Sequence, residues 1–246
     1  AENLVNLVVA DRLDSVPMDE VMRALAPGGV ALIGGSRTAK PWPKEMGEWT
    51  HYLGDASGNA VARDTLVGPP RRLQWADGPL WARHHELNTS VMALVSAKGR
   101  VFYICDEAPA TIAGLPDQWA LVAARRLAAV GDRVYVTLGF NAPLTALDAA
   151  TGETVTTYKG TEFTDEVLWH DGLLILSVNK GPQGPGRMAE KPPVRKQVMA
   201  LRADTGEVLW RRGDYGGIAS KSDVFERITH LSLVAGGGRA FLLEED

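Results

Sequence analysis

An eight-residue motif occurs twice in this chain, and it constrains the fold more than any other sequence feature. The first copy runs from Ala146 to Glu153 and the second, 54 positions later, from Ala200 to Glu207, with six identical positions of eight. Repeats of this length are typical of stacked supersecondary units. In each copy Ala-Leu-x-Ala predicts a strand, Thr-Gly-Glu predicts a turn in which glycine tolerates positive φ, and a second strand follows. The repeat therefore predicts antiparallel hairpins.

A second pattern, a glycine-bearing turn that leads into an apolar strand, alternates with the first. It occurs at residues 98–103, 131–136, 170–175 and 237–242. Four such turns indicate four units, each with two hairpins, as in a propeller blade of four antiparallel strands. From about Leu73 onward no clear helical pattern interrupts the short β-branched and aromatic runs. Arg100 and Arg133 in the first two turns are only 33 residues apart, so we expect the first unit to lack an outer strand or to be irregular.

The beginning of the chain has a different pattern, typical of α/β structure. The apolar run 4–9 is typical of a buried strand in a parallel sheet. Apolar residues recur at helical spacing from Met18 to Ala26, Pro27-Gly28-Gly29 ends that helix, and residues 30–33 predict another strand. The proline-rich stretch 40–44 predicts an extended linker. We therefore expect an α/β segment over 1–38, a linker and lead-in over 39–70, and a β domain over 71–246.

Composition excludes several classes of protein. Hydrophobic residues make up 45% of the chain and charged residues 23%, as is typical of folded soluble proteins. The formal net charge of −4 provides no basic field, so we expect no nucleic-acid partner. Cys105 is the single cysteine, which excludes an intrachain disulfide. No apolar run approaches the roughly 18 residues of a membrane helix, so we expect no transmembrane segment.

The repeat resembles that of a known family. The segments 146–153 and 200–210 are similar to the repeat of the pyrroloquinoline-quinone-like (PQQ-like) β-propellers, which include quinoprotein alcohol dehydrogenases, and the resemblance covers about residues 70–246. The segment 48–60 with Val67-Gly68-Pro69-Pro70 resembles the lead-in of a bacterial subgroup in which such a propeller follows a methyltransferase-like domain. Residues 1–35 resemble the last part of a class I S-adenosylmethionine (SAM)-dependent methyltransferase.

The resemblance implies a mainly β fold, a partial PQQ-like β-propeller of about four blades of four antiparallel strands, preceded by a short α/β, Rossmann-like methyltransferase remnant. A full ring in that family has about eight blades, so we expect the chain to be part of a longer protein and the missing blades to be among its partners. The residues that carry the repeat are expected to be structural: Ala146, Asp148, Thr151, Gly152, Glu153, Ala200, Thr205, Gly206, Glu207 and Trp210.

Only the resemblance to this family, and no motif of its own, implies a cofactor for this chain. Quinoprotein dehydrogenases hold PQQ with a calcium ion, a stacking tryptophan and commonly two adjacent cysteines, and this chain lacks that cysteine pair. A quinone site here would need acidic residues and a tryptophan near the ring centre, for which the candidates are Trp119, Asp106, Glu107 and Asp165. The SAM site is expected to be absent, because the Gly-x-Gly turn and the acidic ribose-binding residue of such a site are not found.

Other candidate residues favour structural interpretations. His84, His85 and Glu86 are of metal-ligating types, but adjacent strand residues point to opposite faces, so we expect no metal site. His51 with Asp55 favours local capping over acid/base chemistry. The basic residues of the segment 180–196 predict a solvated insertion, with anion binding as the alternative. The seven tryptophans are expected to pack mostly between blades, with stacking on a quinone or sugar as the alternative.

These observations favour a binding function. We expect a scaffold that binds an unknown protein or small-molecule ligand, without catalysis by this chain itself. The alternatives are a fragment of a PQQ-dependent oxidoreductase, and a SAM-dependent methyltransferase whose cofactor-binding half lies upstream. The resemblance implies an extracytoplasmic, periplasmic location.

Overall fold

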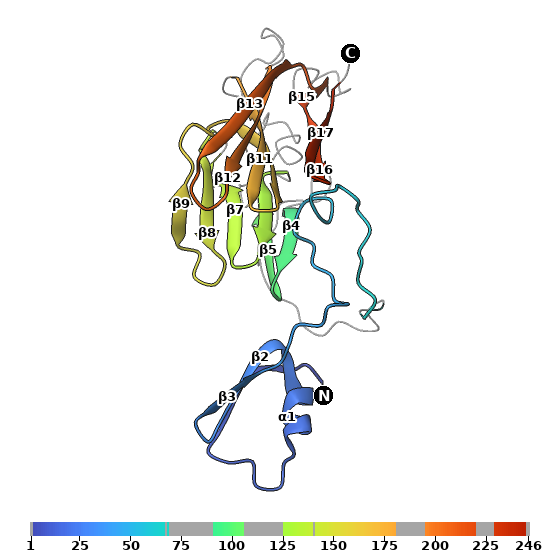
Figure 1. The fold of residues 1–246 in the computed structure, drawn as a ribbon, viewed down its shortest axis with the longest axis vertical. Coiled ribbons are helices and arrows are strands. Elements are labelled where there is room, and N and C mark those ends of the chain that lie inside the picture. Colours follow the sequence, from blue (N-terminus) through green and yellow to red (C-terminus); the bar gives the residue numbers. More distant parts are fainter. Residues whose placement is uncertain are drawn as a thin grey trace, which may run out of the picture. The chain divides into compact units, whose positions relative to one another are not determined.

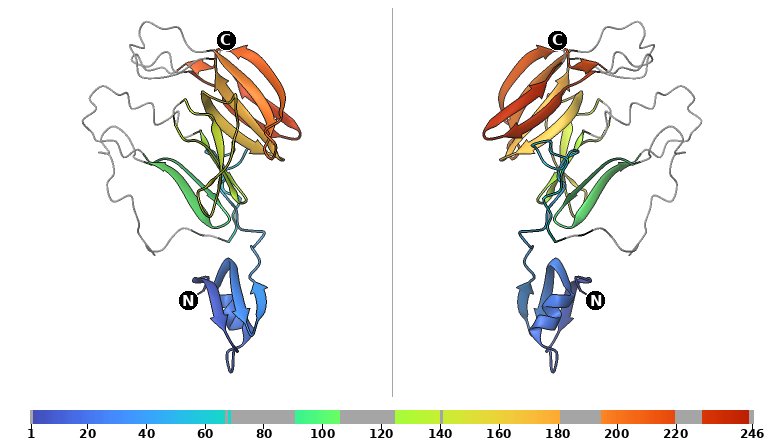
Figure 2. Two further views of the ribbon diagram at one scale, coloured as in Figure 1. Left: turned by 90° about the vertical axis from the view of Figure 1, so that its left-hand side faces the viewer. Right: turned by 90° about the vertical axis from the view of Figure 1, so that its right-hand side faces the viewer.

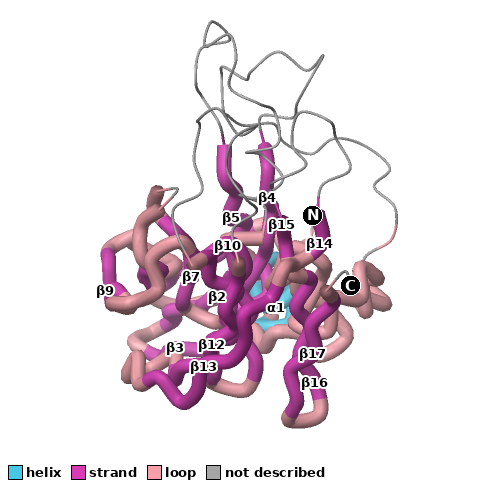
Figure 3. The backbone as a smooth tube through the Cα atoms, turned by 90° about the horizontal axis from the view of Figure 1, so that it is seen from above, coloured by secondary structure: helices cyan, strands magenta, loops and turns pink. Residues whose placement is uncertain are grey.

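A computed structural model describes residues 2–66, 68, 91–105, 125–139, 141–180, 195–219 and 229–244. The chain divides into two compact units, one of Ala1–Glu48 with Ala62–Arg71 and the other of Trp49–Val61 with Arg72–Asp246. The segment expected as linker and lead-in is therefore shared between the two units. Figure 1 labels the elements, and Figure 3 shows that strands predominate. The described residues form a mainly β structure with one helix, as expected.

The first unit contains a three-stranded sheet and a helix. Its elements are β1 (Val5–Ala10), α1 (Met18–Ala24), β2 (Leu25–Ile33) and β3 (Ser36–Ala39), with β1 parallel to β2 and β3 antiparallel to it. The helix is shorter than the pattern predicts, because β2 already begins at Leu25. In the ladder Val5 pairs with Leu25 but Leu7 pairs with Val30, so residues 26–29 form an irregularity within β2.

The expectation that the first strand is buried is wrong. Leu7 is 55% exposed and Val9 is 68% exposed. Only Val5 and Val8 of this strand pack against the small core that includes Val21. The physical reason is coverage, since α1 is the one helix among the described residues and a single helix covers one face of a sheet.

The second unit consists of antiparallel sheets. Two of them have four strands in sequential order, β6-β7-β8-β9 and β10-β11-β12-β13, and the other three have two strands each among the described residues. The bounds are β4 (Val91–Ala97), β5 (Arg100–Cys105), β6 (Leu127–Val130), β7 (Arg133–Thr137), β8 (Leu144–Asp148), β9 (Thr154–Thr157), β10 (Thr164–His170), β11 (Leu173–Asn179), β12 (Lys196–Arg202), β13 (Val208–Tyr215), β14 (Ile218–Ala219), β15 (Thr229–His230), β16 (Ser232–Gly236) and β17 (Arg239–Leu243).

The hairpins predicted from both sequence motifs are confirmed. Each of the four glycine-bearing turns joins two paired strands: β4 to β5, β6 to β7, β10 to β11, and β16 to β17. The two Thr-Gly-Glu motifs join β8 to β9 and β12 to β13. The irregularity that we expected in the first repeat unit, between the turns at Arg100 and Arg133, concerns residues 106–124, which lie outside the described residues.

The two Thr-Gly-Glu turns have the same backbone geometry. Gly152 and Gly206 both have φ of 74°, a conformation that glycine adopts without strain. In the first turn, Asp148 Oδ1 accepts hydrogen bonds from the backbone N–H groups of Ala150 and Thr151 at 2.9 and 3.0 Å. The second turn has Arg202 in place of that aspartate, so the backbone geometry does not depend on the aspartate.

Successive sheets pack face to face, as the views in Figure 2 show. One apolar cluster joins β6–β8 to β10–β12 and includes Tyr135, Leu144, Leu174 and Met199. A second cluster joins β4 to β6 and β7, and a third joins the other face of β10–β12 to β16. The first three strands of each four-stranded sheet are therefore buried on both faces, which explains their apolar runs, whereas the outer strands β9 and β13 are largely exposed. Among the described residues there is no helix long and apolar enough to span a membrane.

Candidate functional site

A short segment, Trp49–Ala56, hydrogen-bonds in turn to four sheets; we call it the strap. The backbone N–H of Ser96 in β4 donates to the Trp49 carbonyl at 2.7 Å, and that of Ala129 in β6 donates to the Thr50 carbonyl at 2.9 Å. Ala235 in β16 donates to the Ala56 carbonyl at 2.7 Å.

The fourth strap contact is made by a side chain. The backbone N–H of Trp169 in β10 donates to Nε2 of His51 at 2.9 Å. Trp169 is the penultimate residue of its strand, and the other three donors hold the same position in β4, β6 and β16. The strap thus satisfies backbone donors of four edge strands at equivalent places, which protects edges that would otherwise be open to pairing.

His51 has a structural role in this arrangement. Its ring is 3% exposed, and burial lowers its pKa to about 4. Because Nε2 accepts a hydrogen bond, the neutral ring carries its proton on Nδ1, which lies 2.8 Å from Thr50 Oγ1. The local capping expected for this region is made by Asp55, whose Oδ1 accepts a hydrogen bond from the Ser57 backbone at 2.8 Å. His51 instead binds a strand far away in sequence, which the local pattern did not reveal.

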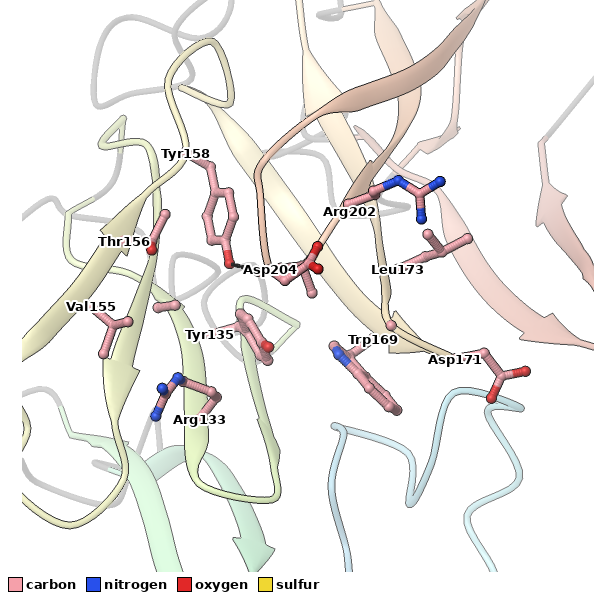
Figure 4. A pocket seen from close by; sticks show the side chains of 13 residues that line it. Arg133, Tyr135, Val155, Thr156, Tyr158, Trp169, Asp171, Leu173, Arg202 and Asp204 are labelled. Atoms are coloured by element: carbon pink, nitrogen blue, oxygen red, sulfur yellow. Dashed lines mark hydrogen bonds between the residues drawn. The ribbon is translucent and has the colours of Figure 1, made fainter.

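A groove of about 520 Å³ lies between the two four-stranded sheets, at the end where β10 turns into β11 (Figure 4). Its lining residues come from β7 to β10, from the first residue of β11, the last residue of β12 and the adjoining turns, and they are Arg133, Tyr135, Ala146, Val155, Thr156, Tyr158, Trp169, Asp171, Gly172, Leu173, Arg202, Ala203 and Asp204. Its volume is within the usual range for small-molecule sites. Ala146 of the repeat motif is therefore also a wall of this groove.

Two tyrosines form the floor of the groove and are held firmly. Tyr135 is 5% exposed and Tyr158 is 3% exposed. The Tyr158 hydroxyl donates to the Ala203 carbonyl at 2.5 Å, which links the two sheets. Burial raises the pKa of Tyr158 to about 12 and also raises the pKa of Tyr135, whereas Arg133 and a hydrogen bond with Trp169 act against the rise at Tyr135. Both phenols are therefore neutral at physiological pH.

The charged groups at the groove differ in how they are paired. Arg133 lies 3.3 Å from Asp148, and Arg202 lies 3.1 Å from Glu207. Asp204, in contrast, has no hydrogen bond or ion pair with the described part of the chain. Figure 4 shows Asp204 close to the aromatic rings, whereas the Arg202 side chain extends away from them. The groove therefore offers an accessible carboxylate beside aromatic surface.

A second polar cluster is buried inside the sheet β10–β13. Lys196 is fully buried, and its Nζ donates to Asp165 Oδ2 and, at 2.7 Å, to Asn179 Oδ1. A β-bulge between Thr164 and Glu166 disturbs the pairing register at Asp165, and such bulges redirect side chains. The sequence interpretation of the segment 180–196 as solvated is therefore wrong at Lys196, which occupies an inward position of β12. Lys180 and Arg195 are ion-paired to Asp214 at the surface.

Glu166, the residue after Asp165 in β10, links its own sheet to the two neighbouring sheets. Its carboxylate lies 2.8 Å from Arg125 Nη1, just before β6, and accepts a hydrogen bond from the Leu233 backbone in β16 at 3.2 Å. Burial raises the pKa of Glu166 to about 7, although Arg125 favours the ionised form. Burial also lowers the pKa of Arg126, and the nearby Asp165 opposes that effect. This cluster lies at the opposite end of β10 from the groove turns, and it contains three cationic groups, on Arg125, Arg126 and Lys196, against the two carboxyl groups of Asp165 and Glu166.

Of the residues proposed from sequence for a quinone site, only Asp165 belongs to the described part of the chain. Asp165 is buried and its Oδ2 accepts a hydrogen bond from Lys196, so a calcium ion at this carboxylate would lie beside an ammonium group. Asp106, Glu107 and Trp119 lie outside the described residues, as do His84, His85 and Glu86. In the part of the chain that the structure describes, no group of three or more metal-ligating side chains is found.

The repeat residues that we expect to be structural lie in strands and turns, and Trp210 packs against the apolar cluster that joins β10–β12 to β16. The groove residues Tyr135, Tyr158 and Trp169 were not selected as a site from sequence, since the chain segments that carry them are up to 34 residues apart, from Tyr135 to Trp169.

Comparisons with protein-family models and with curated protein sequences find no match to this chain.

Proposed function

We propose that this chain is a ligand-binding scaffold built from blades of the PQQ-like β-propeller type, without catalysis of its own, and that its first unit is of the methyltransferase-like type. The sequence repeat, the sequential four-stranded sheets and their face-to-face stacking support the propeller assignment. The strap supports it further. Its hydrogen bonds to the penultimate residues of β4, β6, β10 and β16 are expected if the first strand of each blade lies near a common central axis.

The observation that carries the binding function is the groove between the two four-stranded sheets. It is lined by three aromatic side chains whose positions are fixed by hydrogen bonds and burial, together with charged groups at its rim. Rigid aromatic surface with a few polar groups is typical of ligand sites. Asp165, the quinone-site candidate within the described residues, is bound to Lys196, so the residues present there do not fit a calcium-bound quinone.

The test is a ligand panel measured by thermal shift and calorimetry. The panel contains organic cations, organic anions, neutral saccharides, and PQQ with calcium. We expect saturable binding of one class to the wild-type protein and its loss in Thr156→Trp, because Thr156 lines the groove from β9 and an indole would fill it. Thr157→Trp is the matched control, since Thr157 is the next residue of the same strand and does not line the groove.

The proposal has two clear ways to fail. Binding by no class, or equal binding by wild type and Thr156→Trp, contradicts the groove as a ligand site. Turnover of an alcohol with PQQ, calcium and a dye acceptor contradicts the absence of catalysis.

A further inference from the structure

We propose that the groove binds a guanidinium group, presented by a small molecule or by an arginine side chain. This inference rests on the proposed function, because it names the ligand class of the same groove. Three features of the groove favour this ligand: its charge, the exposure of its aromatic rings, and the hydrogen-bonding groups that remain available.

Charge favours a cation. The two arginines of the groove are each paired with a carboxylate, Arg133 with Asp148 and Arg202 with Glu207. The groove also contains Asp171 and Asp204. The lining itself holds two arginines and two aspartates, but each arginine is paired with a carboxylate outside the lining, Asp148 or Glu207, so the charges of Asp171 and Asp204 are not offset by these arginines. An anionic ligand would have to compete with existing carboxylates for either arginine, whereas a cation meets these two aspartates.

The aromatic rings favour a flat cation. Tyr135 and Tyr158 are only 5% and 3% exposed, so they offer little open ring face to a ligand. A quaternary ammonium group prefers a cage of open ring faces, which these two tyrosines do not provide. Trp169 is only partly buried and offers ring surface beside them. A planar guanidinium can stack on such a ring while it occupies a narrow space.

The available acceptor favours a group with several donors. The Asp204 carboxylate has no hydrogen bond or ion pair with the described residues, and it is exposed, so a ligand reaches it without displacing a protein group. Burial is the main cause of the raised pKa of Tyr135 and of Tyr158, and the charge of Asp204 adds a smaller rise at both phenols. A guanidinium can donate two parallel hydrogen bonds to one carboxylate, which neither an ammonium point charge nor a neutral sugar ring matches. Asp204 and Trp169 together thus define the guanidinium position.

The test is calorimetry with N-acetyl-arginine amide, which carries a single guanidinium. The matched ligand is N-acetyl-citrulline amide, which has nearly the same shape and no charge. Because the carboxylate is exposed, we expect a dissociation constant of about 1 mM, and we expect binding to weaken with added salt. We expect the citrulline compound to bind at least about tenfold more weakly.

Variants locate the contact. Asp204→Asn is expected to weaken binding of the arginine compound about tenfold or more, since it removes the charge and keeps the shape. Asp132→Asn is the matched control, because Asp132 is an exposed carboxylate paired with Lys98 on the β6–β7 turn and outside the groove. Equal binding of the arginine and citrulline compounds, or wild-type affinity in Asp204→Asn, overturns the proposal.

Further ligands separate the possible sources and the possible failures. Tighter binding of agmatine indicates a small-molecule ligand, and tighter binding of an acetylated Gly-Arg-Gly amide indicates a peptide; both outcomes support a guanidinium site. If a saccharide, an anion or tetramethylammonium binds in a Thr156→Trp-sensitive manner and the arginine compound does not, the guanidinium assignment fails and the proposed binding function stands. If no compound of any class binds, the proposed function itself fails.

Discussion

The sheets β6–β9 and β10–β13 share a motif and a topology but differ in what they bury. The ladder between β7 and β8 ends at the pair Thr137 and Leu144. At the corresponding point the ladder between β11 and β12 continues for two more pairs, the last of which is Asn179 with Lys196. The buried polar cluster lies at this extension. The motif therefore defines the turn and the strand order. The greater length of β11 and β12 provides the buried positions that Asn179 and Lys196 occupy.

The same two sheets also carry complementary charges at equivalent positions. Arg125 and Arg126 precede β6, and Asp165 and Glu166 lie 40 residues later at the start of β10. Glu166 pairs with Arg125, and Asp165 lies close enough to Arg126 to affect its pKa. Opposite charges at equivalent positions favour one alignment of neighbouring sheets over others, a role that buried ionic groups can serve.

The largest expected effect comes from breaking the cluster that distinguishes the second sheet. Lys196→Met leaves the Asp165 carboxylate buried without its partner, so we expect a loss of about 3 to 5 kcal/mol in the free energy of unfolding. Urea denaturation measures this loss. Lys180→Met is the control, because Lys180 makes an exposed ion pair and should cost less than about 1 kcal/mol.

A double variant sharpens this prediction. Lys196→Met with Asp165→Asn removes both charges, so its cost should be smaller than the sum of the two single changes. A Lys196→Met protein as stable as Lys180→Met would show that the buried pair does not distinguish the two sheets energetically.

The next effect concerns pH and separates the strap from the intersheet carboxylate. Burial lowers the pKa of His51 from 6.5 to about 4, so the unfolded chain binds more protons and stability falls as pH falls through that window. Burial raises the pKa of Glu166 from 4.5 to about 7, so the folded state binds more protons and stability falls as pH rises through that window. Between pH 4.5 and 6.5 the two contributions oppose each other.

Two variants reveal the opposed contributions. Relative to wild type, His51→Gln should lose stability with rising pH across this range, and Glu166→Gln should gain it, each by up to about 1.4 kcal/mol per pH unit. Urea unfolding at several pH values measures the slopes. Parallel pH profiles for all three proteins would contradict both assignments.

The smallest expected effect compares the two motif turns directly. Gly152→Ala and Gly206→Ala each place a side chain at φ of 74°, which should cost about 1 to 2 kcal/mol. Gly206→Ala should cost more, because its Cβ would lie 3.3 Å from the Tyr158 ring, whereas nothing lies within 4 Å at Gly152. Thermal unfolding gives the difference. Gly152→Asn is the control and should cost less than Gly152→Ala, since asparagine tolerates this conformation. Equal costs for both alanine variants would indicate that Tyr158 moves aside freely.

Much of the β architecture could be predicted from local sequence. The glycine turns and the alternating apolar runs are short-range signals, and they predicted six hairpins of the second unit. The burial of β1 was predicted wrongly, because apolar composition reports a preference for burial and not the presence of a covering element. Lys196 was also interpreted wrongly, since a basic residue near other basic residues gives no signal of a buried aspartate 31 positions earlier.

The sequence by itself determined the turns, the strand order within each sheet and the mainly β class, because these depend on backbone conformations that residues a few positions apart select. Only the tertiary structure decided where His51 binds, which carboxylates Lys196 and Arg125 meet, and that two tyrosines and a tryptophan converge on one groove. These arrangements depend on the length of each strand and on which faces of the sheets pack together, and such relations join residues that have no local pattern in common.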